Sequence, residues 1–205
     1  MNALILVDLQ NDFAPSGALP VPRGDEVVAV ANRLLALFPC IVATQDWHPA
    51  SHKSFAINHP GRQAGEVIEL SGIRQILWPV HCVSGSTGAE LLPGLDKKRI
   101  RKTIQKGTDP EIDSYSAFFD NGHRKSTELK LFLNQREIWD VFIMGLATDY
   151  CVKFSVLDSI RLGFKTHLIL DGCRGVELAF GDVERAVEEM RAAGVEILDS
   201  QELIH

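Results

Sequence analysis

Leu4-Ile5-Leu6-Val7-Asp8, close to the N-terminus, is an apolar run that ends in a carboxylate. Its apolar residues do not alternate with polar ones, which is typical of a strand buried on both faces of a parallel sheet. Similar runs recur along the chain. They predict strands at Ala3–Asp8, Ile41–Gln45, Arg99–Gln105, Val141–Gly145, Thr166–Leu170 and Val195–Leu198.

Helical patterns separate these strands. Asp25–Phe38 places its apolar residues on one stripe of a helix. The same pattern predicts helices at Ser126–Gln135, Asp149–Leu162 and Asp182–Ala193. Gly163 and Gly194 follow the last two, and glycine commonly ends helices. The alternation of strands and helices predicts an α/β fold in which helices cover a parallel sheet.

Two long stretches, Asp46–Ser86 and Asp109–Gly122, do not fit either pattern. The first is rich in histidine, proline and glycine, and the second contains a cluster of aromatic residues. Irregular segments of this length within a compact domain tend to be functional. We therefore expect both stretches to contribute to a site.

The composition is that of an ordinary globular protein. With 205 residues, 45% of them hydrophobic and 23% charged, the chain is expected to form a single domain over residues 1–205. A net charge of −6 argues against binding to nucleic acid or to an anionic membrane surface. The chain contains no apolar run of bilayer-spanning length and no recognisable signal peptide, which predicts a cytoplasmic protein. Cys40, Cys82, Cys151 and Cys173 are accordingly expected to be reduced.

Three polar residues mark the ends of predicted strands: Asp8, Lys106 and, shortly after the fourth strand, Cys151. In open parallel sheets the chemistry collects at the carboxyl ends of the strands, so these side chains are expected to meet. A thiol, a carboxylate and an amine together would form a nucleophile with a base and an electrostatic partner. Thr148 or Asp149 would cap the following helix, and both the helix start and Lys106 would favour the thiolate.

Each of these residues also has a simpler interpretation. Cys151 would then be a buried, inert cysteine, as most cysteines are. Asp8 would cap the turn at Asn11 and Asp12, and Lys106 would be a solvated surface lysine. What favours catalysis is the shared position of the three residues at strand ends.

A second group of residues suggests a metal site. Asp46, His48, His52 and His81 combine a carboxylate with three imidazoles, a set that suits zinc, iron or manganese. The set leaves coordination positions for water or substrate, as a catalytic metal site requires. The alternative is that these are polar loop histidines. Cys82 is a possible further ligand, although its adjacency to His81 would usually point it away.

Aromatic residues flank these polar groups. Phe13, Trp47, Trp78 and Tyr115 would wall a pocket for a flat ring. The alternative for each of them is ordinary packing in the core or in a loop.

In order along the chain, several segments resemble those of bacterial nicotinamidases, also called pyrazinamidases, within the isochorismatase-like cysteine hydrolase superfamily. The segments are Asp8–Phe13, Asp46–His52, Trp78–Val83, Lys106–Gly107, Asp113–Asp120 and Gly145–Val152. The resemblance covers nearly the whole chain, and only the stretch His59–Gly72 matches poorly. It implies a three-layer α/β/α fold with a six-stranded parallel sheet.

The resemblance also implies roles for individual residues. Asp8, Lys106 and Cys151 would form a catalytic triad, and the backbone N–H groups of Ala147 and Cys151 an oxyanion hole, beside a cis peptide bond at Leu146–Ala147. One divalent metal ion would be bound by Asp46, His48, His52 and His81. Substrate contacts would come from Phe13, Trp78, Tyr115, Leu146 and Ala147.

The activity implied is hydrolysis of nicotinamide to nicotinate and ammonia, and of pyrazinamide to pyrazinoate, through a cysteine thioester in NAD salvage. The partner would be this small-molecule substrate, and the chain would act as a monomer or homodimer. One alternative is another cysteine amidase of the superfamily, such as an N-carbamoyl-amine hydrolase. The other is a non-catalytic protein that binds a metal or nicotinamide.

Overall fold

Six strands of the computed structural model form one parallel sheet in the order β5-β2-β1-β6-β7-β8. The structure describes residues 1–204. His205, which has no predicted role, lies outside the described residues. The strands of this sheet are β1 (Asn2–Val7), β2 (Ile41–Asp46), β5 (Lys102–Lys106), β6 (Asp140–Leu146), β7 (Lys165–Arg174) and β8 (Glu196–Leu198). The α-helices are α1 (Val27–Leu34), α2 (Leu129–Asn134), α3 (Lys153–Arg161) and α4 (Asp182–Ala192).

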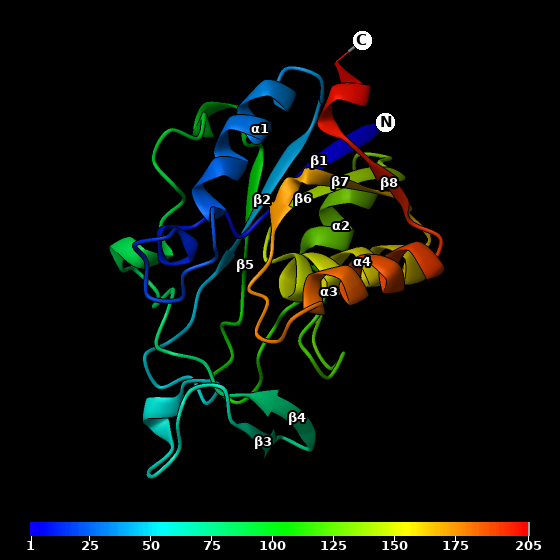
Figure 1. The fold of residues 1–205 in the computed structure, drawn as a ribbon. Helices are drawn as coiled ribbons and strands as arrows, with labels where there is room; N and C mark the ends of the chain where they lie inside the picture. Colours follow the sequence, from blue (N-terminus) through cyan, green and yellow to red (C-terminus); the bar gives the residue numbers. More distant parts are fainter. Residues whose placement is uncertain (205) are drawn as a thin grey trace.

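Helices cover both faces of the sheet. α1 lies on one face, and α3 and α4 lie side by side on the other (Figure 1). α1 and α3 both contact β7, each from its own face of the sheet. This three-layer α/β/α arrangement with a six-stranded parallel sheet confirms the predicted fold class.

The central strands explain the absence of polar alternation in the sequence. Ala3–Val7 of β1 are completely buried, and β1 pairs with β2 on one side and with β6 on the other. Because α1 and α3 exclude water from opposite faces of the sheet, both sets of alternating side chains in such a strand must be apolar.

Several boundaries differ from the predicted ones. α1 is shorter than predicted and follows a 3-10 turn at Gly24–Glu26, and β5 begins only after a 3-10 turn at Lys97–Arg99. The predicted helix Asp149–Leu162 begins as a π-helical turn, Thr148–Val152, and continues as α3. Gly163 and Gly194 end α3 and α4 in left-handed conformation, as predicted.

The predicted helix cap is wrong. Within residues 1–204, neither Thr148 nor Asp149 makes a side-chain cap to the turn that it begins. The Asp149 carboxylate instead accepts hydrogen bonds from the backbone N–H groups of Val176 and Glu177, at 3.0 and 2.8 Å. Asp149 therefore fastens the loop after β7 to the start of the α3 segment, a contact that depends on the tertiary structure.

The irregular stretch Asp46–Ser86 contains a hairpin that the sequence analysis missed. β3 (Val67–Leu70) and β4 (Ile73–Ile76) pair antiparallel, away from the main sheet (Figure 1). The intervening Ser71 and Gly72 both have positive φ values, 52° and 79°, which suits a two-residue hairpin turn. Only one residue of β3 is buried, so the strand has little apolar pattern to detect.

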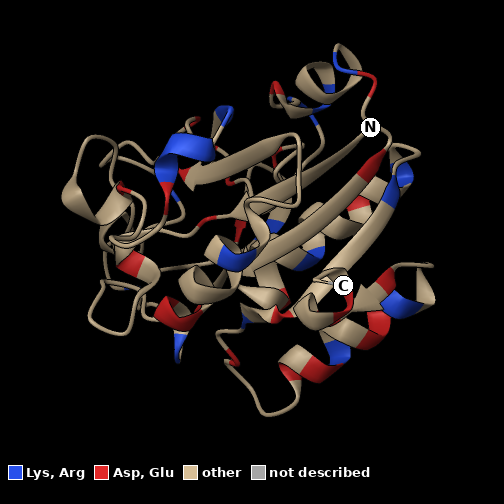
Figure 2. Cartoon of the chain, turned by 90° about the horizontal axis from the view of Figure 1, so that it is seen from above, with Lys and Arg blue, Asp and Glu red and all other residues tan. Residues whose placement is uncertain are grey.

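Charged residues of both signs are interspersed over the molecule (Figure 2), within an overall net charge of −6. Among residues 1–204, none of the helices combines the length and apolarity needed to cross a membrane.

At Gly145, β1 leaves no room for a side chain on β6. Its φ is 133°, and a Cβ atom there would lie 2.1 Å from the Val7 carbonyl oxygen. The register between β6 and β7 also shifts between Ile143 and Gly145. Glycine at this position therefore lets β6 bend next to Leu146 and the segment that follows it.

We predict that Gly145→Ala destabilises the protein by about 3 kcal/mol or more, because it combines backbone strain with overlap against β1. The matched control is Gly163→Ala, where φ is 87° but nothing lies within 4 Å of the added Cβ. The control should lose only about 1 kcal/mol, the cost of the left-handed conformation. Urea denaturation measures both losses, and equal losses would contradict this account of Gly145.

Candidate active site

Lys106, the last residue of β5, lies at the centre of a buried polar cluster. Its Nζ is 2.8 Å from Asp8 Oδ2 and 2.5 Å from Asp46 Oδ1, and it donates to the Ser114 carbonyl oxygen at 2.9 Å. Cys151 Sγ lies 3.4 Å from the same nitrogen. With only 2% of its surface exposed, Lys106 is not a solvated lysine. The three residues predicted as a triad are thus brought together.

Asp8 leaves β1 in a left-handed conformation, with φ of 52°. Thr44 of β2 holds it there: the Thr44 hydroxyl accepts from the Asp8 N–H at 3.1 Å and donates to Oδ1 at 2.5 Å. The other carboxylate oxygen faces Lys106. Asp8 therefore points into the cluster rather than capping the turn at Asn11 and Asp12.

Cys151 lies in the π-helical turn that follows β6. The N–H groups of Tyr150 and Val152 both donate to the Ala147 carbonyl oxygen at 3.1 Å, which closes this turn. Ser155 donates to the Cys151 carbonyl oxygen at 2.6 Å and anchors the turn to α3. The peptide bond between Leu146 and Ala147 is cis, as the resemblance implied. Cys40, Cys82, Cys151 and Cys173 are all free, as expected for reduced thiols.

The two carboxylates beside Lys106 differ in acidity. Burial would raise the pKa of Asp46, but Lys106 and His48 outweigh it and hold this pKa well below its ordinary value. Burial raises the pKa of Asp8, with a smaller opposing effect of Lys106. Lys106 itself stays charged, because Asp46 and Asp8 overcome its burial and raise its pKa. Asp46 is thus the more acidic of the two carboxyl groups, and Asp8 is the better proton acceptor.

The Cys151 thiol is buried, and burial opposes the effect that was expected to favour its thiolate. Burial raises the pKa of Cys151 well above its ordinary value, and the charges of Asp8 and Asp46 raise it further. Lys106 lowers this pKa, as expected, but does not compensate for the other effects. Burial and the two carboxylates therefore favour the thiol over the thiolate, which makes a nearby base such as Asp8 important for its activation.

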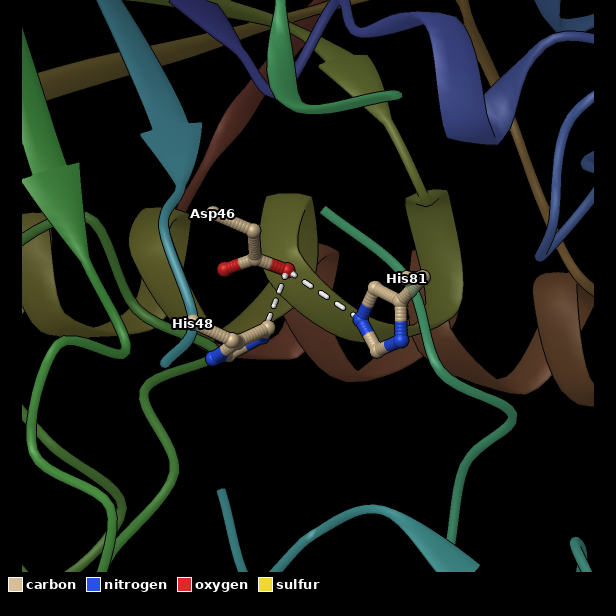
Figure 3. A group of neighbouring side chains, drawn as sticks. All are labelled: Asp46, His48 and His81. Carbon is tan, nitrogen blue, oxygen red and sulfur yellow. Dashed lines mark ion pairs between the residues drawn. The ribbon is translucent and has the colours of Figure 1, made fainter. Parts of the chain in front are cut away.

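Asp46 also belongs to the group of residues that suits a metal ion. Its carboxylate lies between His48 and His81, with Oδ2 3.6 and 3.7 Å from their Nε2 atoms (Figure 3). One ligand atom from each residue lies within 4.8 Å of the others. A single ion with bonds of about 2.0–2.2 Å holds its ligands at comparable spacing.

The fourth predicted ligand, His52, is not in the group formed by Asp46, His48 and His81. His52 forms a separate group with His48 and Asp113, again with ligand atoms within 4.8 Å. The rings of His48 and His52 are 4.3 Å apart. Burial, together with His48, lowers the pKa of His52 to about 4, so this imidazole is neutral and can act as a ligand. Asp113 was not among the predicted residues, although it lies in the irregular stretch Asp109–Gly122.

The histidines are oriented as metal ligands usually are. His48 Nδ1 is 2.8 Å from the Gly107 carbonyl oxygen, and His81 Nδ1 is 2.8 Å from that of Pro79. Since a carbonyl can only accept, each Nδ1 carries the proton and each Nε2 offers a lone pair. Within residues 1–204, the buried Nε2 atom of His48 has no hydrogen-bond partner, which fits a cation at this position. His52 differs, because its Nδ1 accepts a hydrogen bond from the Ser54 N–H at 3.1 Å.

Cys82 is turned away from this group. Its Sγ lies 3.9 Å from the Gly88 carbonyl oxygen, and its N–H donates to Asp12 at 2.6 Å. Its φ is 45°, so Cys82 adopts a left-handed conformation directly after His81. Asp12 thus holds the turn in which His81 lies.

A small pocket opens beside Cys151. Tyr150 packs edge-to-face against Trp78 and Tyr115, with ring centroids 4.9 and 5.5 Å apart, and Phe13 also lines the pocket. Tyr115 is held by hydrogen bonds at 3.0 Å from Trp78 Nε1 and Gln75 Nε2.

Asp46, His81, Ala147 and Cys151 share this pocket with the aromatic side chains. Two residues that were predicted to contact substrate or to wall the pocket, Leu146 and Trp47, are not among the described residues that line it. Leu146 is buried in the core, and Trp47 packs against the core. Sequence reasoning missed Tyr150, whose only signal was its position next to Cys151.

The comparisons agree with this geometry. The family model "Isochorismatase domain" matches residues 2–202. A nicotinamidase of Escherichia coli is 52% identical over 94% of this chain and 92% of its own length. Among solved structures, a nicotinamidase and pyrazinamidase from Acinetobacter baumannii has a TM-score of 0.96 at 44% identity, covering 98% of this chain and 97% of that one.

A pyrazinamidase of Pyrococcus horikoshii, solved in complex with zinc, has a TM-score of 0.78 at 36% identity, covering 97% of this chain and 98% of its own. The matches extend over nearly the full length of each protein, from β1 through β8. With its six-stranded sheet and the acid, lysine and cysteine gathered at one edge, the chain belongs to the isochorismatase family.

Proposed function

We propose that this protein is a nicotinamidase, which hydrolyses nicotinamide to nicotinate and ammonia and accepts pyrazinamide as well. The observation that carries the proposal is the shared Lys106 ammonium, which joins Asp8, Cys151 and the metal-site residue Asp46 in one buried cluster. The reaction would recycle nicotinamide for NAD synthesis. The 52% identity to a nicotinamidase supports this choice of substrate.

The chemistry follows from the charges of the cluster. Asp8 takes the proton from Cys151, and the thiolate attacks the carboxamide carbon of the substrate. Asp8 then gives this proton to the leaving nitrogen, so that ammonia departs and a thioester remains. Water, deprotonated by Asp8, attacks the thioester, and the acid is released as the proton returns to sulfur. Lys106 stays protonated and stabilises the negative charge that moves between Asp8 and Cys151.

Two features would stabilise and orient the reacting carboxamide. The backbone N–H groups of Ala147 and Cys151 would donate to the oxyanion, an effect worth ~3–4 kcal/mol per donor in comparable enzymes. The ring would lie between Phe13 and Trp78, which both line the pocket beside Cys151, with Tyr115 at its side.

Asp46, His48 and His81, with His52 beside them, would hold one divalent ion, which we propose to be zinc, iron or manganese. The unpaired Nε2 atom of His48 and the Nδ1–H tautomers of His48 and His81 support this assignment. When bound, the ion supplies a Lewis-acid position for the pyridine nitrogen of the substrate and so orients the ring.

Two other functions are distinguished by simple assays. An N-carbamoyl-amine hydrolase would share Asp8, Lys106 and Cys151, but it would release ammonia from a carbamoylated amine in preference to nicotinamide. A non-catalytic binding protein would bind nicotinamide without releasing ammonia. The Asp46, His48 and His81 group favours nicotinamidase over the first, and the complete triad favours an enzyme over the second.

We predict that Cys151→Ala folds normally but loses nearly all release of ammonia from nicotinamide, because no nucleophile remains. Cys40→Ala and Cys173→Ala are the controls, since these cysteines are equally buried but lie away from Lys106. They should keep most of the activity. Wild-type turnover by Cys151→Ala would rule out the covalent mechanism.

We predict that benzamide is a much poorer substrate than nicotinamide, because its ring lacks the nitrogen that the ion would hold. The carboxamide to be cleaved is otherwise the same, so kcat/KM for the two amides isolates recognition of the ring. Equal values would exclude ring-nitrogen binding as the basis of specificity, even for a protein shown to contain one ion per chain.

We predict that Cys151 ionises above pH 9 in the metal-free protein. The ordinary thiol pKa is 9.0, and burial with two nearby carboxylates raises that of Cys151 well above it. The absorbance of thiolate at 240 nm, taken as the difference between wild type and Cys151→Ala, should therefore rise only above pH 9. A transition near pH 6 would instead show a preformed thiolate and remove the need for Asp8 as base in the first step.

A further inference from the structure

Gln10 is a completely buried polar residue to which the proposed mechanism assigns no role. Its carboxamide makes two hydrogen bonds with the backbone of one residue, Asp46: Oε1 accepts from the Asp46 N–H and Nε2 donates to the Asp46 carbonyl oxygen, both at 2.8 Å. Nε2 also donates to the Ala89 carbonyl oxygen at 2.8 Å. Both amide hydrogens and the amide oxygen are thus in use.

The need for this contact arises from the lengths of the strands. β1 ends at Val7, and its pairing with β2 ends at Leu6 opposite Ala43. β2 continues to Asp46, where on its other side it is still paired with Lys106 of β5. β2 therefore extends beyond the end of β1. At Asp46, the backbone N–H and C=O groups on the β1 side of β2 need another hydrogen-bond partner.

Gln10 supplies this partner from the turn that follows β1. Asp8 turns the chain out of the strand in left-handed conformation, and Gln10 N–H donates to the Asp8 carbonyl oxygen at 2.8 Å. The Gln10 side chain then points back toward β2 and meets the backbone of Asp46. A carboxamide has the same donor and acceptor groups as a peptide unit, so it extends the β1 side of the sheet by one step.

We propose that Gln10 is a positioning residue for Asp46, which fixes the backbone of this residue so that its carboxylate faces both Lys106 and the metal site. The proposal rests on the assignment of Asp46 as a metal ligand. The two hydrogen bonds from Gln10 fix the N–H and the C=O of Asp46. The Cα–Cβ bond of Asp46 lies between these groups, so its direction, and with it that of the carboxylate, is restrained. Loss of this restraint should weaken metal binding in a protein that still folds.

Gln45 provides a matched control. Its Nε2 donates to the same Ala89 carbonyl oxygen at 2.8 Å, but its side chain makes no hydrogen bond to the Asp46 backbone within residues 1–204. Gln10→Met and Gln45→Met each remove a buried or half-buried amide and one bond to Ala89 at similar side-chain volume. Only Gln10→Met releases Asp46.

The test uses the full chain, stripped of metal and titrated with Co²⁺ against a chromophoric chelator, without substrate. Gln10→Met should lower the affinity for Co²⁺ at least about tenfold, as loss of a contact behind a ligand commonly does. The visible absorption bands of the bound Co²⁺ should also shift. Gln45→Met should retain wild-type affinity and spectrum. Gln10→Asn, which keeps the amide but is one methylene too short, should behave as Gln10→Met and replaces it if that variant does not fold.

Wild-type affinity and spectrum in both Gln10 variants would overturn the proposal, even with a lower melting temperature of the metal-free protein, because Gln10 would then act in folding alone. Equal losses in Gln10→Met and Gln45→Met would also overturn it, by tracing the effect to the Ala89 contact. Failure of the wild-type protein to bind Co²⁺ would instead refute the metal site itself.

Discussion

The buried ammonium of Lys106 is the interaction on which the site depends. Two carboxylates, Asp8 and Asp46, share it at 2.8 and 2.5 Å, and a thiol lies 3.4 Å away. Burying any of these charges alone would be strongly unfavourable. Both carboxyl groups are buried, but Lys106 and His48 outweigh the burial of Asp46 and hold its pKa low, whereas burial raises the pKa of Asp8 despite the opposing effect of Lys106. The two carboxyl groups beside one cation thus differ in acidity, and Asp8 is the better proton acceptor.

The order of the strands makes this arrangement possible. β5, β2, β1 and β6 are consecutive in the sheet, and they end in or just before Lys106, Asp46, Asp8 and Cys151 respectively. Parallel strands place all four ends on one edge, and the 4.7–4.9 Å spacing of neighbouring strands brings side chains from adjacent ends into contact.

The loops around the strand ends are held by polar contacts that act through the backbone. Gly107 and Pro79 accept from the Nδ1 atoms of His48 and His81, and Asp12 holds the turn at Cys82. The aromatic wall is held instead by side-chain hydrogen bonds, which Gln75 and Trp78 donate to the Tyr115 hydroxyl.

The apolar runs and the polar residues that end them were sufficient to predict the sheet, the helices between its strands and the meeting of Asp8, Lys106 and Cys151. The reason is that burial on both faces of a parallel sheet leaves a local pattern in each strand, and parallel strands share one exit edge. The resemblance to a known family added the cis bond at Leu146–Ala147.

Only the tertiary structure decided the pKa values of the buried groups and the contacts between residues that lie far apart in the sequence. The thiol of Cys151 has a raised pKa because the folded chain buries it between two carboxylates, whereas its helix-start position alone suggested the reverse. Asp113 joined the site through its approach to His48, and Gln10 through its hydrogen bonds to Asp46, which is 36 residues away in sequence. Such contacts leave no periodic signal, because burial and through-space charge depend on the packing of segments that the sequence keeps far apart.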